Sequence, residues 1–206
     1  MDLKPGNKEQ TILEVAERLF LEKGYTGTKT TEIADEAGVN HALLHYYYRT
    51  KENLFNKIFE QKALQLFESF SITIDNDSSF FDKIKDAIEK HFEILMKTPN
   101  LPLFIFREIV SDKERKAFIM NYLFPIGKEL LKKLKIVIRH EVKKGTIRRV
   151  KAIDLLLNIV SLNVFSIIAA QMFFDFNAEE DREKIGIFLE ERKKKNAELI
   201  INSLKY

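Results

Sequence analysis

The sequence of 206 residues contains no cysteine, which excludes disulfide bonds and thiolate ligands for metals. It has only 7 glycines and 4 prolines, the residues that most often interrupt helices and mark turns. Its first ten residues, MDLKPGNKEQ, lack the apolar stretch of a secretory signal peptide. We therefore expect a mostly helical protein of the cytoplasm.

A strong charge of one sign is absent as well. The formal net charge is +3, and residues 1–55 carry seven basic against nine acidic side chains, a net charge of −2. Binding of this segment to DNA would therefore depend on where single charges stand, not on bulk attraction. Residues 132–151 carry nine basic side chains and one acid. Their helical spacing opposite an apolar face favours a solvated helix face over a second DNA surface.

Apolar residues recur at helical spacing along most of the chain and predict an all-α fold of about nine helices. The expected helices cover about residues 7–23, 31–36, 41–48, 51–70, 79–97, 102–111, 113–123, 125–144, 149–175 and 180–204. Residues 71–79 should form a polar loop, and Pro125 should separate two helices. The glycines expected to end helices are Gly24, Gly38 and Gly145. The expected N-caps are Thr28 or Thr30, Asn40 and Thr50.

Residues 155–174 form a run of twenty residues without a charged side chain, which is long enough to cross a bilayer. Asn158, Asn163 and Gln171 are costly in hydrocarbon, whereas a bundle core or a dimer interface accommodates a helix that is apolar nearly all round. We interpret the run as a buried helix of a soluble protein without a membrane partner. A membrane-anchored regulator is the alternative.

The first 56 residues describe a helix-turn-helix: short helices with a tight turn, AGVN, between the second and the third. In the third helix, HALLHYYY, Leu44 and Tyr48 lie four residues apart and therefore share one face, which we expect in the core. His41 and His45 lie on the opposite side, flanked by Ala42 and Tyr46. Tyr47 falls between the two faces.

The segment TKTTEIADEAGVNHALLHYYYRTKENLF resembles the N-terminal domain of the TetR family of bacterial transcriptional regulators, over about residues 8–56. The chain departs from the family pattern at four positions, where the pattern has Ser, Gly, Tyr and His. These positions are Asn40, Ala42, His45 and Tyr47. Ala42, with His41 before it, is where we expect operator preference to differ from that of relatives.

The resemblance implies which positions face DNA: Thr30, Asn40, His41, Ala42, His45, Tyr46, Tyr47 and Lys51. Hydroxyls and the start of a helix can hold phosphates, and Lys51 can neutralise one. Leu43 or Ala42 can contact a thymine methyl group, and Lys29 adds a phosphate contact. Two other interpretations remain: a metal site at His41 and His45, and simple packing of the tyrosines.

The resemblance also implies two domains, a DNA-binding domain at 1–52 and an effector-binding and dimerisation domain at 53–206. An apolar cavity between helices is expected to be lined by Phe104, Phe118, Tyr122, Phe165 and Met172, with His91 and Arg107 as the polar groups that orient a ligand. The alternative, which is favoured for each apolar residue taken singly, is that these side chains fill the core. The last two helices are expected to form the interface of a homodimer through Leu157, Val160, Val164, Ile167, Ile168, Ile187, Phe188, Leu199 and Ile200.

These features lead to one main hypothesis: a homodimeric repressor that a small apolar or amphipathic ligand releases from a two-fold DNA operator. A DNA-binding protein of the same family without a small effector is the second hypothesis. An enzyme is the third, and it is disfavoured because no catalytic triad, phosphate-binding loop or metal cluster stands out. No cofactor or metal is expected.

Overall fold

The computed structural model describes residues 5–70 and 78–206, so most of the expected loop at 71–79 lies outside the described residues. Within these ranges the chain is helical and contains no strand, which confirms the all-α prediction. The helices are α1 (Pro5–Gly27), α2 (Thr30–Glu36), α3 (His41–Tyr48), α4 (Lys51–Glu68), α5 (Phe80–Lys97), α6 (Leu101–Ser111), α7 (Lys113–Lys144), α8 (Ala152–Phe173) and α9 (Arg182–Leu204), with a short 3-10 turn at Glu179–Asp181 before α9.

The chain forms two compact units. The first comprises residues 1–64 and 103–120, and the second comprises residues 65–102 and 121–206. The predicted domain boundary at residues 52 and 53 falls inside α4, which continues through both units, and this boundary remains a prediction.

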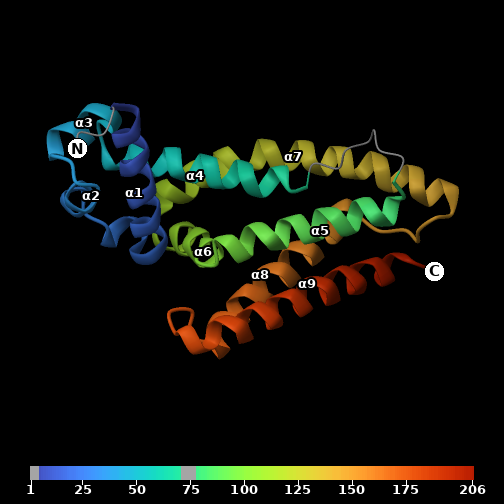
Figure 1. Cartoon of the computed structure of the whole chain (residues 1–206). Coiled ribbons are helices and arrows are strands. Elements are labelled where there is room, and N and C mark those ends of the chain that lie inside the picture. The colour runs from blue at the N-terminus through green and yellow to red at the C-terminus, as the bar shows by residue number, and fades with distance from the viewer. Residues whose placement is uncertain (1–4, 71–77) are drawn as a thin grey trace. The chain divides into compact units, whose positions relative to one another are not determined.

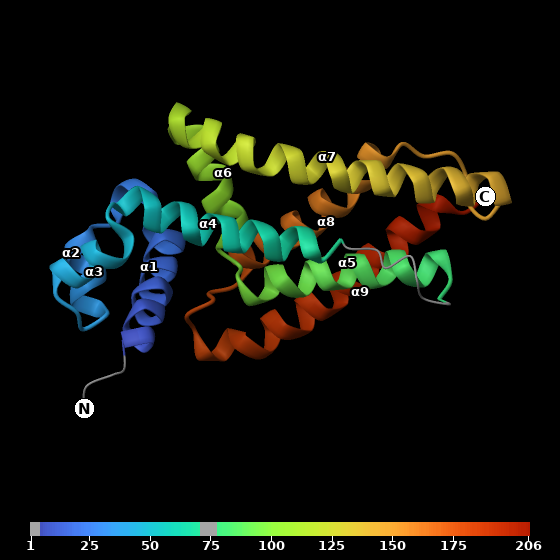
Figure 2. The ribbon, with the colours of Figure 1, turned by 90° about the horizontal axis from the view of Figure 1, so that it is seen from above.

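In the first unit, α1, α2 and α3 pack against one another around a small core (Figures 1 and 2). Phe20 contacts the rings of Tyr25 and Phe55, with ring centroids 6.1 and 5.6 Å apart. Leu44 and Tyr48 are buried, as their shared helical face predicts. Burial raises the pKa of Tyr48 to about 12, so its hydroxyl stays protonated and donates to the carbonyl of Glu9.

The turn between α1 and α2 differs from the expectation in one respect. Gly24 has a positive φ of 73°, as expected for a helix-ending glycine, but one further turn of helix follows it to Gly27. Neither Thr28 nor Thr30 caps α2, whose N-cap is Lys29 without a side-chain hydrogen bond. Thr28 is buried instead, and its hydroxyl lies within hydrogen-bonding distance of the carbonyls of Leu19 and Gly24. The prediction failed because burial gave this hydroxyl acceptors inside α1.

The prediction that Pro125 separates two helices is wrong, because α7 runs through it from Lys113 to Lys144. A proline inside a helix removes one backbone hydrogen bond and kinks the helix without having to end it. Buried apolar residues on both sides, Ile119 before the proline and Leu134 and Ile138 after it, keep the two halves helical. Gly145, with φ of 76°, ends α7 as expected.

In the second unit, α5, α8 and α9 lie side by side (Figures 1 and 2). One apolar cluster includes Ile84, Ile88 and Ile159, and a second includes Phe92, Leu95 and Ile167. Helix α8 is long and apolar enough to cross a membrane by length and composition. It places Asn163 and Ser166 in the buried contact with α5 and α9. Only 33% of its most apolar window is buried, however, so the expectation of a core helix holds for one face of α8 and not for the whole helix.

A buried polar network joins these three helices. Asn163 on α8 donates to the carbonyl of Ile88 at 3.0 Å, and its amide nitrogen lies 3.1 Å from Nδ1 of His91. From α9, Asn196 donates to Asn163 at 3.1 Å and in turn accepts from Arg192 at 2.7 Å. Since the amide nitrogen of Asn163 can only donate, Nδ1 of His91 accepts, and the imidazole is neutral.

Burial lowers the pKa of His91 to about 4, and this predicts acid sensitivity. An unfolded histidine titrates near pH 6.5, so below that pH the unfolded chain binds a proton that the folded chain does not. Stability from His91 is therefore complete above about pH 6.5 and is lost as the pH falls toward 4. We expect the free energy of unfolding in urea to fall by about 2 kcal/mol between about pH 7.5 and pH 5 through this group.

The His91→Phe variant keeps an aromatic ring against Phe70, whose ring centroid lies 4.7 Å away, but it cannot titrate. Its stability should change less with pH than that of the unchanged chain, whereas His140→Gln, at an exposed histidine, should leave the pH dependence as it is. Equal slopes for His91→Phe and the unchanged chain would contradict the assignment.

Candidate nucleic-acid interface

The turn between α2 and α3 is held by local hydrogen bonds. Gly38 has φ of 62°, and Asn40 caps α3 by accepting from the backbone N–H of Leu43 at 2.8 Å. Nε2 of His41 lies 3.1 Å from the hydroxyl of Thr30, which links the first residues of α3 and α2. The predicted helix and its cap are therefore confirmed, and the exposed N-terminus of α3 is fixed in place.

The three tyrosines of α3 divide as the helical geometry predicts. Tyr48 is buried, Tyr47 is half-buried, and Tyr46 is 70% exposed. The ring of Tyr46 lies edge-on to that of Tyr47, with centroids 5.4 Å apart. Because the core is filled by Leu44 and Tyr48, Tyr46 leaves its ring and hydroxyl exposed to solvent. His41, Ala42 and His45 are exposed beside it.

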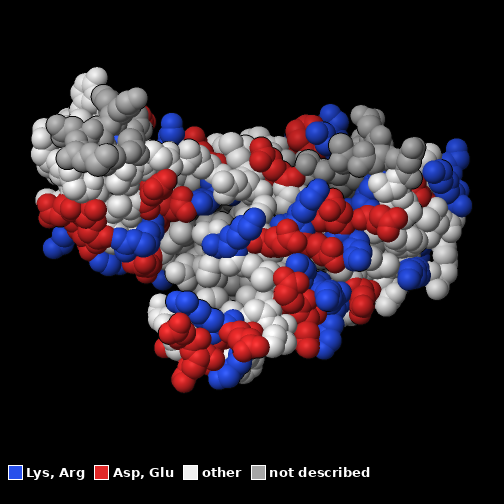
Figure 3. Space-filling model, in the orientation of Figure 1, with Lys and Arg blue, Asp and Glu red and all other residues white. Residues whose placement is uncertain are grey.

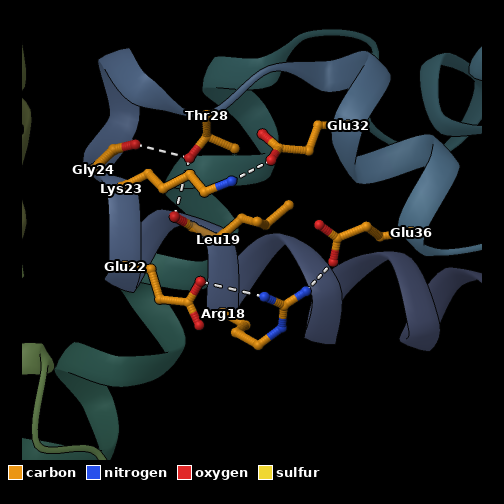
Figure 4. A network of polar contacts seen from close by, with 8 residues as sticks. All are labelled: Arg18, Leu19, Glu22, Lys23, Gly24, Thr28, Glu32 and Glu36. Carbon is orange, nitrogen blue, oxygen red and sulfur yellow. Dashed lines mark hydrogen bonds and ion pairs between the residues drawn. The ribbon is translucent and has the colours of Figure 1, made fainter. Parts of the chain in front are cut away.

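Helix α1 holds α2 through ion pairs. Arg18 pairs with Glu22 and Glu36, and Lys23 pairs with Glu32, while the hydroxyl of Thr28 anchors the turn between these helices (Figure 4). Acidic and basic side chains accordingly gather together over this part of the surface (Figure 3). These contacts neutralise Glu32 and Glu36, two of the three acidic side chains of α2, and so reduce the negative charge that this helix would present to DNA.

At the start of α4, Thr50 caps the helix by accepting from the N–H of Asn53 at 3.1 Å, as predicted. Lys51 is half-buried, and its ammonium lies 4.2 Å from the centroid of the Tyr25 ring. Lys29 and Arg49 are exposed near the two ends of the helix-turn-helix. Sequence reasoning did not single out Arg49 or Tyr25, and no local motif would have identified them.

Arg49 joins α3 to α4 in a strained turn. It is the only non-glycine residue with a positive φ in the described ranges, 62°, and the N–H of Thr50 donates to the carbonyl of Tyr48 at 2.6 Å. This i to i+2 hydrogen bond closes a γ-turn, which is strained for residues with a side chain. Its position beside Tyr47 and Lys51 makes Arg49 a further candidate for a DNA phosphate.

The strain at Arg49 predicts that Arg49→Gly stabilises the fold. Glycine adopts this conformation without a Cβ clash, so we expect the free energy of unfolding to rise by about 1 kcal/mol. Chemical denaturation of both chains measures it. Arg49→Ala is the matched control, because it removes the charged group but keeps the Cβ and should not stabilise the chain. Equal stabilisation by both variants would show that the side chain, not the backbone, is the cause.

The residues predicted to line a ligand pocket are divided between the two units. In the first unit, Phe104 packs on Phe55 and Phe118 packs on Phe59, with ring centroids 5.7 and 5.8 Å apart. Arg107 is exposed on α6, and Tyr122 is half-buried on α7. His91 lies in the polar network of the second unit. Phe165 and Met172 are exposed on α8, a position that suits a partner surface better than a cavity wall.

The residues predicted for the dimer interface fall into three groups, which are buried, half-buried or exposed. Ile167 and Ile200 are buried in the core of their own chain, because they lie on the α8 and α9 faces that pack together, so the structure does not offer them to a partner. Val160, Val164, Ile168 and Phe188 are half-buried. The exposed apolar side chains of α8 and α9 are Ile153, Leu157, Phe165, Met172, Phe173, Ile187 and Leu199.

Residues 12–58 match the family described as bacterial regulatory proteins, tetR family. A fatty acid metabolism regulator protein of Bacillus subtilis is 28% identical over 96 residues, which are 47% of this chain and 50% of that protein. The transcriptional repressor KstR2 of Mycolicibacterium smegmatis is 23% identical over 130 residues, 56% of this chain and 63% of that one. The chain thus matches only about half to two thirds of the length of these relatives.

The fold of the whole chain also has a solved counterpart. The transcriptional regulator FadR from Bacillus subtilis, solved in complex with stearoyl-CoA, superposes with a TM-score of 0.68 at 20% identity, over 95% of this chain and 99% of that one. The relatives are named as regulators, which agrees with the expectation that the chain is not an enzyme. The N-terminal helix-turn-helix domain of the chain therefore belongs to the tetR family of bacterial regulatory proteins.

Proposed function

We propose that the chain is a cytoplasmic, sequence-specific DNA-binding repressor that works as a homodimer. The observation that carries this proposal is the exposed front of α3, where His41, Ala42 and Tyr46 stand on a capped, fixed helix. Such a helix fits the major groove, with its first residues at base edges and its flanking hydroxyls and cations at phosphates. The DNA-facing set is Lys29, Thr30, Asn40, His41, Ala42, Leu43, His45, Tyr46, Tyr47 and Lys51, to which Arg49 is added.

Dimerisation through α8 and α9 is supported by the apolar side chains that these helices leave exposed. Ile153, Leu157 and Phe165 recur along α8 at intervals of four and eight residues, so they lie along one face of the helix. Exposed apolar surface of this extent usually marks a protein interface. A two-fold dimer would present two α3 helices to half-sites about 34–36 Å apart on one face of a duplex.

Release by a small apolar or amphipathic ligand is the second part of the proposal. It is supported by the relative named for fatty acid metabolism and by the stearoyl-CoA bound to the structural neighbour. A long-chain acyl-CoA is therefore the first ligand to test, with binding measured by calorimetry and release measured on a bound duplex. A regulator without a small effector is the alternative, favoured by the burial of Phe104 and His91 within the core.

DNA binding is tested with a duplex selected from a random pool by the unchanged chain. We expect Tyr46→Ala and Lys51→Ala each to weaken binding several-fold, because each removes a phosphate contact, and Lys51→Ala to reduce the slope of log K against log salt by about 0.9. Fluorescence anisotropy over a salt series measures both quantities. Exposed Lys90, on α5 of the second unit, provides the control variant Lys90→Ala. Unchanged binding by both Tyr46→Ala and Lys51→Ala would refute the assignment of the interface.

A further inference from the structure

The ring of Tyr25, just after the kink in α1, has two cations close to it. The ammonium of Lys51 lies 4.2 Å and the guanidinium carbon of Arg115 lies 4.4 Å from the ring centroid. Both distances are within the range of a cation–π interaction. The ring itself is held edge-on against Phe55, with centroids 5.2 Å apart. The Lys51 ammonium therefore lies over a ring that is itself packed against the core.

A buried acid holds this arrangement together. Glu108, near the C-terminal end of α6, is only 2% exposed. One of its carboxylate oxygens accepts from the backbone N–H of Tyr25 at 2.9 Å, and the other lies 2.7 Å from Nε of Arg115. A single carboxylate thus fixes the backbone that carries the ring through a hydrogen bond, and its charge neutralises the second cation beside it through an ion pair.

Opposing effects act on the charged form of Lys51. Burial, and then the charge of Arg115, lower the pKa of the Lys51 ammonium, so its charged form is held less well here than in water. The aromatic face of Tyr25 opposes this effect by attracting the cation. A DNA phosphate bound at the start of α4 would stabilise the charged form of Lys51 and so offset the effects of burial and of Arg115.

We propose that Tyr25 and Glu108 are positioning residues of the DNA interface: the Tyr25 ring holds the Lys51 ammonium ready for a phosphate, and Glu108 fixes the backbone of Tyr25 and neutralises Arg115. The proposal rests on the DNA-binding function proposed above and adds two residues, neither of them in the DNA-facing set. The benefit for DNA affinity is preorganisation. A free lysine side chain loses its rotamer freedom on binding, whereas a side chain that is already held over a ring has lost part of this freedom before DNA binds.

For removal of the acid Glu108, this role predicts the opposite change in DNA affinity from the one that long-range electrostatics predicts. Removing an acid from a DNA-binding protein normally tightens binding, because the net positive charge rises. Glu108→Gln should instead weaken binding, because Arg115 then repels Lys51 without a carboxylate to neutralise it. The matched control is Glu114→Gln, which makes the same charge change at an exposed position of α7 and should bind as tightly as the unchanged chain or more tightly.

The arrangement is tested first without DNA. In protein that carries isotope-labelled lysine, the Cε protons of Lys51, assigned with Lys51→Met, should resonate upfield because of the ring current of Tyr25. Tyr25→Leu, which keeps an apolar side chain against Phe20 and Phe55, and Glu108→Gln should both shift this resonance back, whereas Tyr25→Phe should not. An unchanged resonance in Glu108→Gln would overturn the proposal.

The consequence for DNA is tested with the duplex selected by the unchanged chain. Tyr25→Leu and Glu108→Gln should each weaken binding about two- to five-fold, the range that a cation–π interaction supplies, and neither should weaken it further in a Lys51→Met background. Equal losses in both backgrounds would indicate a merely structural role and overturn the proposal, as would tighter binding by Glu108→Gln. Failure of the proposed function would differ: Lys51→Met would then leave binding unchanged while the resonance of Lys51 still responded to Glu108→Gln.

Discussion

The Phe165→Glu variant should be a monomer that no longer binds its operator. Phe165 is 65% exposed on α8, on the helix face that also carries Ile153 and Leu157. In the proposed dimer this ring is buried against the partner, and a carboxylate there would have to be desolvated without a cation to pair with. A chain with one recognition helix loses the gain from two linked contacts, so operator affinity should fall by about 10²–10⁴-fold.

The measurement combines mass photometry, which reports the oligomeric state, with anisotropy on the selected duplex. Phe106→Glu is the matched control: Phe106 is 66% exposed on α6, the chemical change is identical, and the ring lies outside the proposed interface. The control should remain dimeric and bind DNA. A dimeric Phe165→Glu chain, or equal loss of the dimer in both variants, would move the interface away from α8.

The sequence predicted those features of the helix-turn-helix that depend on a few neighbouring residues. Asn40 and Thr50 cap their helices as expected, since a cap needs only an N–H group three residues ahead. Gly38 takes the positive φ of the turn, and Leu44 and Tyr48 share the buried face. In each case the physical cause acts within one or two turns of helix, so residue type and spacing determine the result.

The features that the sequence did not predict depend on groups distant in the chain. Thr28 is not a cap because buried carbonyls of α1 capture its hydroxyl. Glu108 contacts Tyr25 across 83 positions of sequence, a separation over which no periodicity gives information. The γ-turn at Arg49 strains the backbone, and residue preferences did not predict it, since arginine rarely adopts a positive φ.

The interfaces of the second unit illustrate the same limit. Apolar spacing identified α8 and α9 as helices with apolar faces, but it could not separate the face used within the chain from the face left for a partner. Ile167 and Leu157 have similar hydropathy, yet the first is buried and the second is 57% exposed. The buried side-chain amides explain this difference. Asn163 and Asn196 must face each other to satisfy their hydrogen bonds, and this requirement fixes the rotation of α8 and α9 about their axes.

The Ala42→Asp variant should separate folding from DNA binding at α3. The first turn of α3 contains no acidic residue, and a carboxylate near a helix N-terminus is favoured by the helix dipole by about 0.3–1 kcal/mol. Ala42 is exposed, so the larger aspartate side chain can point to solvent without displacing a packed side chain of the first unit. The free energy of unfolding should therefore stay constant or rise slightly.

At the proposed interface the same carboxylate would meet the edges of bases and the phosphates beside them. Like charges brought together in an interface cost several kcal/mol, so operator affinity should fall by more than about a hundredfold. Urea denaturation and anisotropy on the selected duplex measure the two effects, with Asn121→Asp, an exposed site on α7, as the control for added negative charge. If Ala42→Asp bound the duplex as well as this control, α3 would not be the recognition helix. A stable chain that has lost its operator would instead locate the close approach to DNA at Ala42, where this sequence has a methyl group and the family pattern has glycine.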